Sequence, residues 1–460
     1  NDDPLFEDAG AVYGTGHSGG DYRLKSVSPC INTGTNAGWM SGASDIRGTN
    51  RILYGSVDLG AYENVLGPLA CQFSASPLNA LEPADVVFTA RAGGTNTTSL
   101  AYRWDFNGDG TYDTSWLTTS VVTQSLNAGA YTVVLQVTNA VGETVNKTNS
   151  NYVLISPPTV YVSLTGGNTP PYSNWATAAN SLQAAANQAA PTGATILVAG
   201  GTYNLGATLT IAKGLTLRSV NGPTNTIIRA QAAGYRPLLI SGASGWLLDG
   251  FTIRDASNGE IGGGIYITAS ITGSIVNCII RNNTTTGTGG GIASHADVTM
   301  RNCLIAHNSS VWHSGGFAGR SGQGKHTIEN CTFVSNYCSQ FSTNIGYGGE
   351  TDVPGPDPHT LVNCVFLADG INEQGSSTVI YSRIVGTAGA GNITGDPQLA
   401  TVNSWPYSLG PHSPCVDAGT NLGWQAAALD LAARRRIRTG TVDMGAYEYA
   451  PPAGTLIVLY

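Results

Sequence analysis

A four-residue pattern that recurs five times between residues 250 and 366 constrains the fold of this 460-residue chain more than any other feature. Successive copies are 27, 25, 28 and 33 residues apart. The second position is Phe or Cys and the fourth is Ile or Phe, so alternate residues form apolar ladders, as in short strands that stack in parallel. The copies begin at Gly250, Asn277, Asn302, Asn330 and Asn363. The pattern predicts a β-solenoid with one copy per turn and an asparagine ladder at a bend.

Glycine clusters and one helix complete the predicted solenoid. The clusters at residues 262–264, 289–291 and 315–316 predict turns into the next sheet. Residues 174–190 begin with Asn174 and stop before Pro191, which predicts a helix. A helix ahead of stacked strands covers the exposed end of a solenoid, so we expect this one to act as its N-terminal cap.

A second repeat links the two ends of the chain. Residues 28–36 read SPCINTGTN and residues 413–421 read SPCVDAGTN, while residues 57–63 and 442–448 read VDLGAYE and VDMGAYE. The same offset of 385 residues aligns Trp39 with Trp424, Asp45 with Asp430, and Arg51 with Arg436. The match predicts a duplicated module that closes the C-terminal end of a solenoid. The arginine run at residues 434–436 is predicted to be a solvated turn.

The composition excludes several classes of protein. Charged residues make up 11% of the chain and the net charge is -8, with lysine only at Lys25, Lys147, Lys213 and Lys325. No basic run could neutralise a phosphate backbone, so we expect no nucleic-acid binding. No stretch reaches the roughly 18 apolar residues that a membrane helix needs. The eight cysteines fit no zinc-binding spacing, and the four in the solenoid pattern are predicted to be buried thiols rather than a disulfide framework.

Residues 67–157 are predicted to form a β-sandwich, because short alternating strands recur there at the spacing of small antiparallel domains. The centre reads YRWDFNGDGTYD over residues 102–113, and GAYTV follows from residue 129. This segment resembles the polycystic-kidney-disease (PKD) domain, with its WDFGDG signature and G-x-Y-x-V strand. The resemblance implies an immunoglobulin-like sandwich, which we expect to act as a spacer.

The same loop is the sharpest candidate for a metal site. Oxygen-bearing side chains stand at its positions 1, 3, 5 and 9, which are Asp105, Asn107, Asp109 and Asp113. Calcium takes six to eight oxygen ligands on a tight loop, so the spacing predicts calcium as a cofactor. Trp116 stands at position 12, where a bidentate acid is expected, so other groups would have to complete the site. The alternative is an Asx-rich hairpin turn without metal.

The ladders of residues 158–395 make this part of the chain similar to right-handed parallel β-helix proteins of the pectin-lyase-like class. The terminal module resembles the C-terminal part of choice-of-anchor Q domain proteins, which are bacterial surface or secreted β-helices. These resemblances imply an all-β chain outside the cell or on its surface. The expected domains are a cap module of a preceding β-helix (1–66), the PKD-like sandwich (67–157), the β-helix (158–395), the second cap module (396–450) and a tail strand (451–460).

Candidate catalytic residues are few. β-Helices that cleave acidic polysaccharides use a Lys or Arg to abstract a proton beside calcium-binding carboxylates. The nearest approach to such a set is Arg320, Lys325 and Glu329, which fall in one turn of the solenoid. No further feature of the sequence indicates that the three share a face. The sequence therefore favours a protein without catalytic activity and leaves an enzyme open.

We expect a secreted or cell-surface structural protein that forms a rod, stalk or extracellular fibre. Head-to-tail self-association is expected from the first module copy and from the apolar tail at residues 451–460, which could add as a strand to a neighbour. One alternative is a polysaccharide lyase or hydrolase that acts on acidic glycans. Another is an adhesin that binds glycans without cleaving them.

Overall fold

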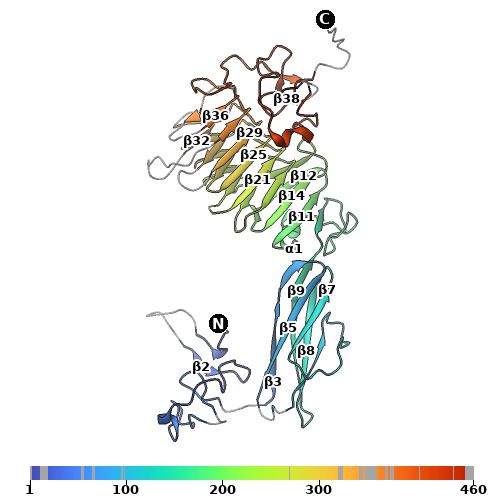
Figure 1. The fold of residues 1–460 in the computed structure, drawn as a ribbon, viewed down its shortest axis with the longest axis vertical. Coiled ribbons are helices and arrows are strands. Elements are labelled where there is room, and N and C mark those ends of the chain that lie inside the picture. The colour runs from blue at the N-terminus through green and yellow to red at the C-terminus, as the bar shows by residue number, and fades with distance from the viewer. Residues whose placement is uncertain are drawn as a thin grey trace. The chain divides into compact units, whose positions relative to one another are not determined.

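The computed structural model is all-β and divides into two compact units, residues 1–155 and 156–460. It describes residues 3–10, 19–52, 56–64, 68–94, 97, 99–268, 270–319, 325–340, 345–347, 360–367, 371–372, 378–402, 405–438 and 440–450. Figure 1 shows the strands of the second unit stacked as successive turns of a solenoid. The predicted fold class is confirmed.

The first unit contains the first module copy and the sandwich. The module has two short strands, β1 (Phe6–Asp8) and β2 (Asp21–Leu24), and the 3-10 helix η2 (Gly38–Met40). One sheet of the sandwich has the order β3-β5-β7, and the other has the order β4-β9-β8-β6. Trp104, Phe73 and Phe88 pack between the sheets and account for much of its core. The strand bounds are β3 Ala70–Ser76, β4 Asn79–Leu81, β5 Ala84–Gly93, β6 Ala101–Asp105, β7 Val121–Leu126, β8 Gly129–Thr138 and β9 Thr144–Ser156.

Four sheets make up the solenoid, and the strand pairs within them run parallel. The first sheet contains β10 (Thr159–Val162), β11 (Thr192–Val198), β14 (Gly214–Ser219), β17 (Trp246–Asp249), β21 (Thr272–Val276), β25 (Asp297–Arg301), β29 (His326–Glu329), β33 (Thr360–Val362) and β36 (Thr378–Ile380). The second, called the docking sheet below, contains β12 (Gly201–Leu205), β15 (Thr226–Ala230), β18 (Thr252–Arg254), β22 (Ile279–Arg281), β26 (Leu304–Ala306), β30 (Thr332–Val334) and β34 (Val365–Leu367).

The remaining strands of this unit form two further sheets and a hairpin. The third sheet contains β13 (Leu209–Ile211), β16 (Leu238–Ile240), β20 (Ile265–Ile267), β24 (Ile292–Ser294), β28 (Phe317–Gly319), β32 (Ile345–Tyr347) and β35 (Ile371–Asn372). The fourth contains β19 (Ser257–Asn258), β23 (Thr284–Thr285), β27 (Ser309–Ser310) and β31 (Tyr337–Cys338). An antiparallel hairpin, β37 (Leu399–Val402) and β38 (Trp405–Leu409), leads into the second module copy and its 3-10 helix η3 (Gly423–Ala427).

The recurring pattern falls on the docking sheet, in register. Ile253, Ile280, Ile305, Phe333 and Phe366 pair in that order along it. Residues at the second and fourth positions are almost fully buried, which confirms the apolar ladders. The asparagines at the first position have φ between 50° and 55°, and Gly250 has φ 85°. This left-handed conformation is one that Asn and Gly adopt at least cost, which explains why these two residues occupy the position.

The glycine clusters form the predicted turns. Gly262 and Gly289 have φ near 75° and precede β20 and β24. A Cβ on Gly290 would lie only 2.6 Å from the carbonyl oxygen of Gly315 in the next turn. The clusters therefore stack backbone on backbone, and a side chain there would push adjacent turns apart.

The helix is shorter than predicted. Helix α1 spans Leu182–Gln188, and its N-cap is Ser181, whose hydroxyl accepts from the N–H of Ala184. The Asn174 side chain instead accepts from the N–H of Thr177 in a separate turn, and Ala179 forms a bridge with Val162. Asn174 therefore caps a turn that ends before the helix, because the chain between them pairs with β10.

The thiols of the pattern are buried and unpaired, as predicted. Cys278, Cys303, Cys331 and Cys364 are 0% exposed, and all eight cysteines are free. Each ladder thiol lies within hydrogen-bonding distance of backbone carbonyls, for example Cys303 Sγ at 3.1 Å from Arg301 O. Burial raises the pKa of the Cys278 thiol to about 12. A thiol held neutral and away from solvent is a poor nucleophile.

We therefore expect iodoacetamide at pH 8 to leave the four ladder thiols of the native protein unmodified. Cys30 is partly exposed and should react first. Peptide mass spectrometry after a timed reaction measures both, and the same reaction in denaturant is the control for intrinsic reactivity. Modification of the ladder thiols at the rate of Cys30 in the folded protein would contradict this packing.

Candidate functional site

The second module copy, residues 413–448, lies along the outer face of the docking sheet. Its Leu431, Ala446 and Tyr447 join one buried apolar cluster with Ile279, Leu304, Ala306 and Val334. A second cluster joins Cys415 and Met444 to Val365 and to Leu409 of β38. These contacts extend over several turns of the solenoid, whereas the sequence predicts closure of its end. The reason is that Ile279, Leu304 and Val365 occupy the outward third position of the pattern and are apolar, so they require cover.

The asparagine ladder holds the module through backbone hydrogen bonds. The side chain of Asn363 accepts from the N–H of Thr420 at 2.7 Å and donates to the carbonyl of the same residue at 2.9 Å. Asn330 donates to the carbonyl of Asp443 at 3.1 Å and accepts from the side chain of Gln425 at 2.6 Å. Asn302 donates to the Leu429 carbonyl at 2.8 Å. The polar ladder predicted from the sequence is therefore also the attachment site of the module.

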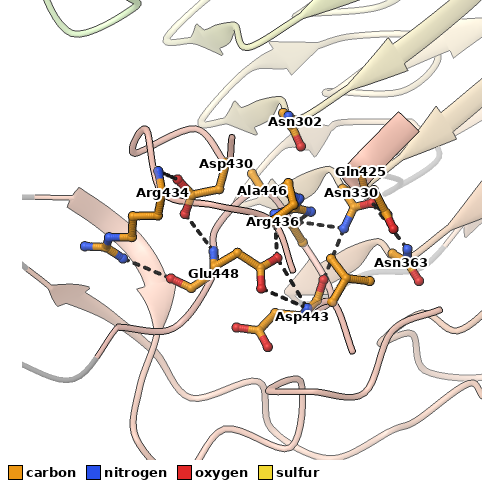
Figure 2. A network of polar contacts seen from close by, with 12 residues as sticks. Asn302, Asn330, Asn363, Gln425, Asp430, Arg434, Arg436, Asp443, Ala446 and Glu448 are labelled. Carbon is orange, nitrogen blue, oxygen red and sulfur yellow. Dashed lines mark hydrogen bonds and ion pairs between the residues drawn. The ribbon is translucent and has the colours of Figure 1, made fainter. Parts of the chain in front are cut away.

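Four charged side chains of the second copy, Asp430, Arg436, Asp443 and Glu448, are buried. Figure 2 shows them close to one another. Arg436 is 0% exposed, and its Nη1 lies 3.0 Å from Glu448 Oε1 while its Nη2 donates to the Gly445 carbonyl. Asp430 accepts from the N–H groups of Ala432, Arg434 and Glu448. Asp443 accepts from the N–H groups of Asp417 and Tyr449. The prediction of a solvated turn at residues 434–436 is therefore wrong for Arg436, because this side chain is buried and its positive charge pairs with Glu448.

Burial sets the protonation of these groups. It raises the pKa of Asp443 to about 6, against two N–H donors that lower it. It likewise raises the pKa of Glu448 and of Asp430, and it lowers the pKa of Arg436. Strongly shifted pKa values can mark catalytic groups, but structural ion pairs shift them too. Here the carboxylate oxygens are occupied by backbone donors or by Arg436, so the arrangement is suited to fastening the module.

The first copy repeats this network residue for residue. Asp45 accepts from Arg47, Thr49 and Glu63, Asp58 accepts from Asn32 and Asn64, and Arg51 pairs with Glu63 at 3.3 Å and donates to Gly60. The equivalence also reaches upstream of the sequence match. Ser28 donates to the Pro4 carbonyl as Ser413 does to that of Pro397, and a two-stranded hairpin precedes each copy. The duplicated unit is thus larger than its sequence signature.

The predicted catalytic residues are not brought together among the described residues. Lys325 and Glu329 lie four residues apart along one extended stretch, so their α-carbons are roughly 13 Å apart. Glu329 pairs with Arg301 at 2.6 Å. Lys325 lines a surface hollow of about 520 Å³ with Trp246 and Asp297 on the first sheet. Arg320 lies outside the described residues.

The predicted calcium ligands lie on a hairpin loop, and their side-chain oxygens mostly accept hydrogen bonds from the backbone N–H groups of that loop. Asp105 is 2% exposed and accepts from the N–H groups of Asn107, Gly108 and Gly110. Asp113 accepts from Phe106, and Asp109 accepts from Thr111. Among the described residues, no group of three or more His, Cys, Asp or Glu side chains is placed to hold a metal ion. The calcium site stays a prediction, and an ion would have to share these oxygens.

Calcium binding to this loop is expected to raise the melting temperature of the sandwich by a few degrees, because a ligand at about ten times its Kd adds roughly 1.4 kcal/mol. The measurement is calorimetry with millimolar calcium against a chelator. Asp109→Ala should abolish the gain, while Asp85→Ala, an exposed carboxyl on β5, is the matched control. An identical melting temperature with calcium and with chelator would reject the site.

Comparison with known families agrees with this architecture. Residues 207–352 match the family described as right handed beta helix region, and residues 70–151 match the PKD domain. The chain is a β-helix protein with a PKD domain. Domains of these two types are typical of extracellular proteins. A search of curated proteins finds no match to this β-helix protein. Among its described residues, no helix is long and apolar enough to cross a membrane.

Proposed function

We propose that this β-helix protein is an extracellular structural protein in which β-helix, module and PKD sandwich serve as the segments of a rod, stalk or fibre. The observation that carries the proposal is the duplicated module, which recurs with the same internal hydrogen bonds on both sides of a sandwich and a solenoid. Resemblance of the module to choice-of-anchor Q domains supports location at the cell surface. Head-to-tail assembly follows as the way such segments extend.

The residues of the solenoid suit a load-bearing element. Its inward positions are apolar, and a second asparagine ladder of Asn283, Asn308 and Asn336 runs through the interior with side-chain bonds of 3.0 and 2.9 Å between successive turns. Stacked repeats of this kind gain stability from each neighbouring interface. The second module adds apolar clusters and asparagine hydrogen bonds across several turns. These features support rigidity rather than turnover of a substrate.

Sedimentation velocity and negative-stain microscopy at increasing protein concentration test the assembly. We expect particles whose length grows in steps of one molecule while their width stays constant. Short particles of one size at every concentration would contradict head-to-tail assembly. Calorimetry of the same samples checks that the protein is folded throughout.

Glycan binding or cleavage is the second candidate, and one observation favours it. The hollow on the first sheet combines Lys325 and Asp297 with Ser274 and Thr299. Its volume of about 520 Å³ lies within the range of ligand pockets. Charged groups beside hydroxyl groups are suited to hydrogen-bond the carboxylate and hydroxyls of a uronic-acid ring.

Incubation with a panel of uronic-acid polysaccharides distinguishes these activities. A lyase would give unsaturated products that Lys325→Ala abolishes, and a hydrolase would give new reducing ends. An adhesin would be retained on the polysaccharide without any product. Thr165→Ala on an exposed loop is the matched control. If no polysaccharide gives a product and none retains the protein, the glycan candidate is excluded.

A further inference from the structure

The two module copies share their internal structure but differ in what covers one face. In the second copy this face packs on the docking sheet, and in the first it is open to solvent. Three equivalent pairs show the contrast: Leu59 is 52% exposed and Met444 0%, Ile46 is 71% exposed and Leu431 3%, and Ala61 is exposed while Ala446 is 0% exposed. Exposed apolar residues gathered on one face mark an interaction surface.

The same face carries the backbone donors that attach the second copy to the solenoid. The N–H groups of Thr420 and Gly445 donate to the side chain and the carbonyl of Asn363, both at 2.7 Å, and that of Ala446 donates to Thr332 Oγ1 at 2.9 Å. The counterparts of these three residues in the first copy are the exposed Thr35, Gly60 and Ala61. The first copy therefore presents the same arrangement of apolar residues and backbone donors that the second copy uses to bind the solenoid.

We propose that this face of the first copy docks on the asparagine-laddered sheet of a parallel β-helix other than the one in the same molecule. The inference rests on the proposed structural role. It identifies the kind of surface to which the first copy binds when segments of the rod are joined. The solenoid of the same molecule is not the occupant, because its Asn302, Asn330 and Asn363 are engaged by the second copy. The partner sheet has outward apolar residues flanked by asparagines in the left-handed conformation.

Two differences between the copies define the partner further. Gln425 of the second copy donates to Asn330, but the equivalent residue of the first copy is Met40, whose sulfur accepts from the Ala37 N–H as Gln425 Oε1 does from Leu422. The partner therefore needs no acceptor at that ladder position. Trp424 stacks with Arg301, which precedes Asn302, at 5.1 Å, and its counterpart Trp39 is 66% exposed. The partner therefore carries a cationic residue before one of its ladder asparagines.

A segment exchange within the full chain tests the complementarity directly. Residues 413–448 are replaced with residues 28–63, which have the same length. We expect the transplanted copy to dock, so that its cysteine, equivalent to the fully buried Cys415, is as unreactive toward a thiol reagent as Cys415 is. The melting temperature should fall by a few degrees, because Asn330 loses the donor that Gln425 supplies. Restoring that donor with Met40→Gln in the transplanted segment should recover most of the loss.

The control exchange carries Leu59→Asp and Ile46→Asp in the transplanted segment and should leave the module undocked, with one more reactive thiol. If the unmodified exchange reacts and melts like this control, the inference is overturned. A second measurement covers the case in which the exchange does not fold. A receiver chain carries Met444→Asp and Leu431→Asp, which free its docking sheet, and Leu59→Asp and Ile46→Asp, which disable its first copy.

Mixed with the unaltered chain, the receiver should form a one-to-one complex by light scattering, and Leu59→Asp with Ile46→Asp in the unaltered chain should abolish it. A complex that survives these two substitutions, or no complex at all, would overturn the inference. Failure of the proposed function is separate, since it is measured as rod growth of the unaltered protein alone.

Discussion

Replacing Arg436 with Met is expected to weaken the docked module by about 3–5 kcal/mol, because removal of one partner leaves a buried charge uncompensated. Glu448 is 2% exposed and would lose its only ion-pair partner among the described contacts, and the Gly445 carbonyl would lose a donor. Calorimetry should show a lower transition for the second unit. Cys415, which packs under Met444, should become reactive at lower temperature.

The double variant Arg436→Met with Glu448→Met separates charge from packing. Replacing both members of a buried pair with apolar residues is often neutral, so the double variant should regain most of the loss. Arg51→Met is the matched control, since Arg51 makes the same contacts in the first copy but belongs to the other unit. It should leave the second unit's transition unchanged. A double variant as unstable as the single one would show that the stabilisation does not come from the ion pair.

The solenoid could be predicted because its physics is local and repetitive. Each turn repeats the same requirements, namely an apolar residue at each inward position and a residue at the bend that tolerates positive φ, so five copies reinforce one pattern. The sandwich was predictable for the same reason, since alternating strands and the WDFNGDG loop of residues 104–110 are adjacent in sequence. Helix α1 was misjudged at its start, because Asn174 and Ser181 are both good caps and only the pairing of Ala179 with Val162 decides between them.

The docking of the second copy could not be predicted because it depends on contacts across more than 100 residues of sequence, such as Asn302 with Leu429. One signal was present: the third position of the pattern is apolar at Ile279, Leu304 and Val365 although it points outward. The second asparagine ladder had a signal as well, since Asn283, Asn308 and Asn336 each follow a pattern asparagine by six residues. For the burial of Arg436, the run of three arginines gave no signal in the sequence other than the match of Arg436 with Arg51.

The docked module is also expected to loosen as the pH rises from 4 to 7. Burial raises the pKa of Asp443 from an ordinary value near 3.8 to about 6, so the folded protein binds this proton more tightly than the unfolded chain does. Such a group stabilises the fold fully below pH 4, and the contribution is lost as the pH rises through 6. A shift of about two units corresponds to roughly 1–3 kcal/mol. Burial raises the pKa of Asp430 as well, which extends the decline in the same direction.

In the first copy, Asp45 is the counterpart of Asp430, and its contribution to stability should change with pH in the opposite direction. Burial acts on Asp45 too, but N–H donors from Glu63, Thr49 and Arg47 outweigh it and lower its pKa, so its stabilisation is lost when the pH falls. Melting curves between pH 3.5 and 8 should therefore show the second unit weakening with rising pH. Asp443→Asn should flatten that slope, and Asp58→Asn at the equivalent position of the first copy should not. Asp443 is 3% exposed, so a slope unchanged in Asp443→Asn would mean that burial within the module does not raise the pKa of this carboxyl.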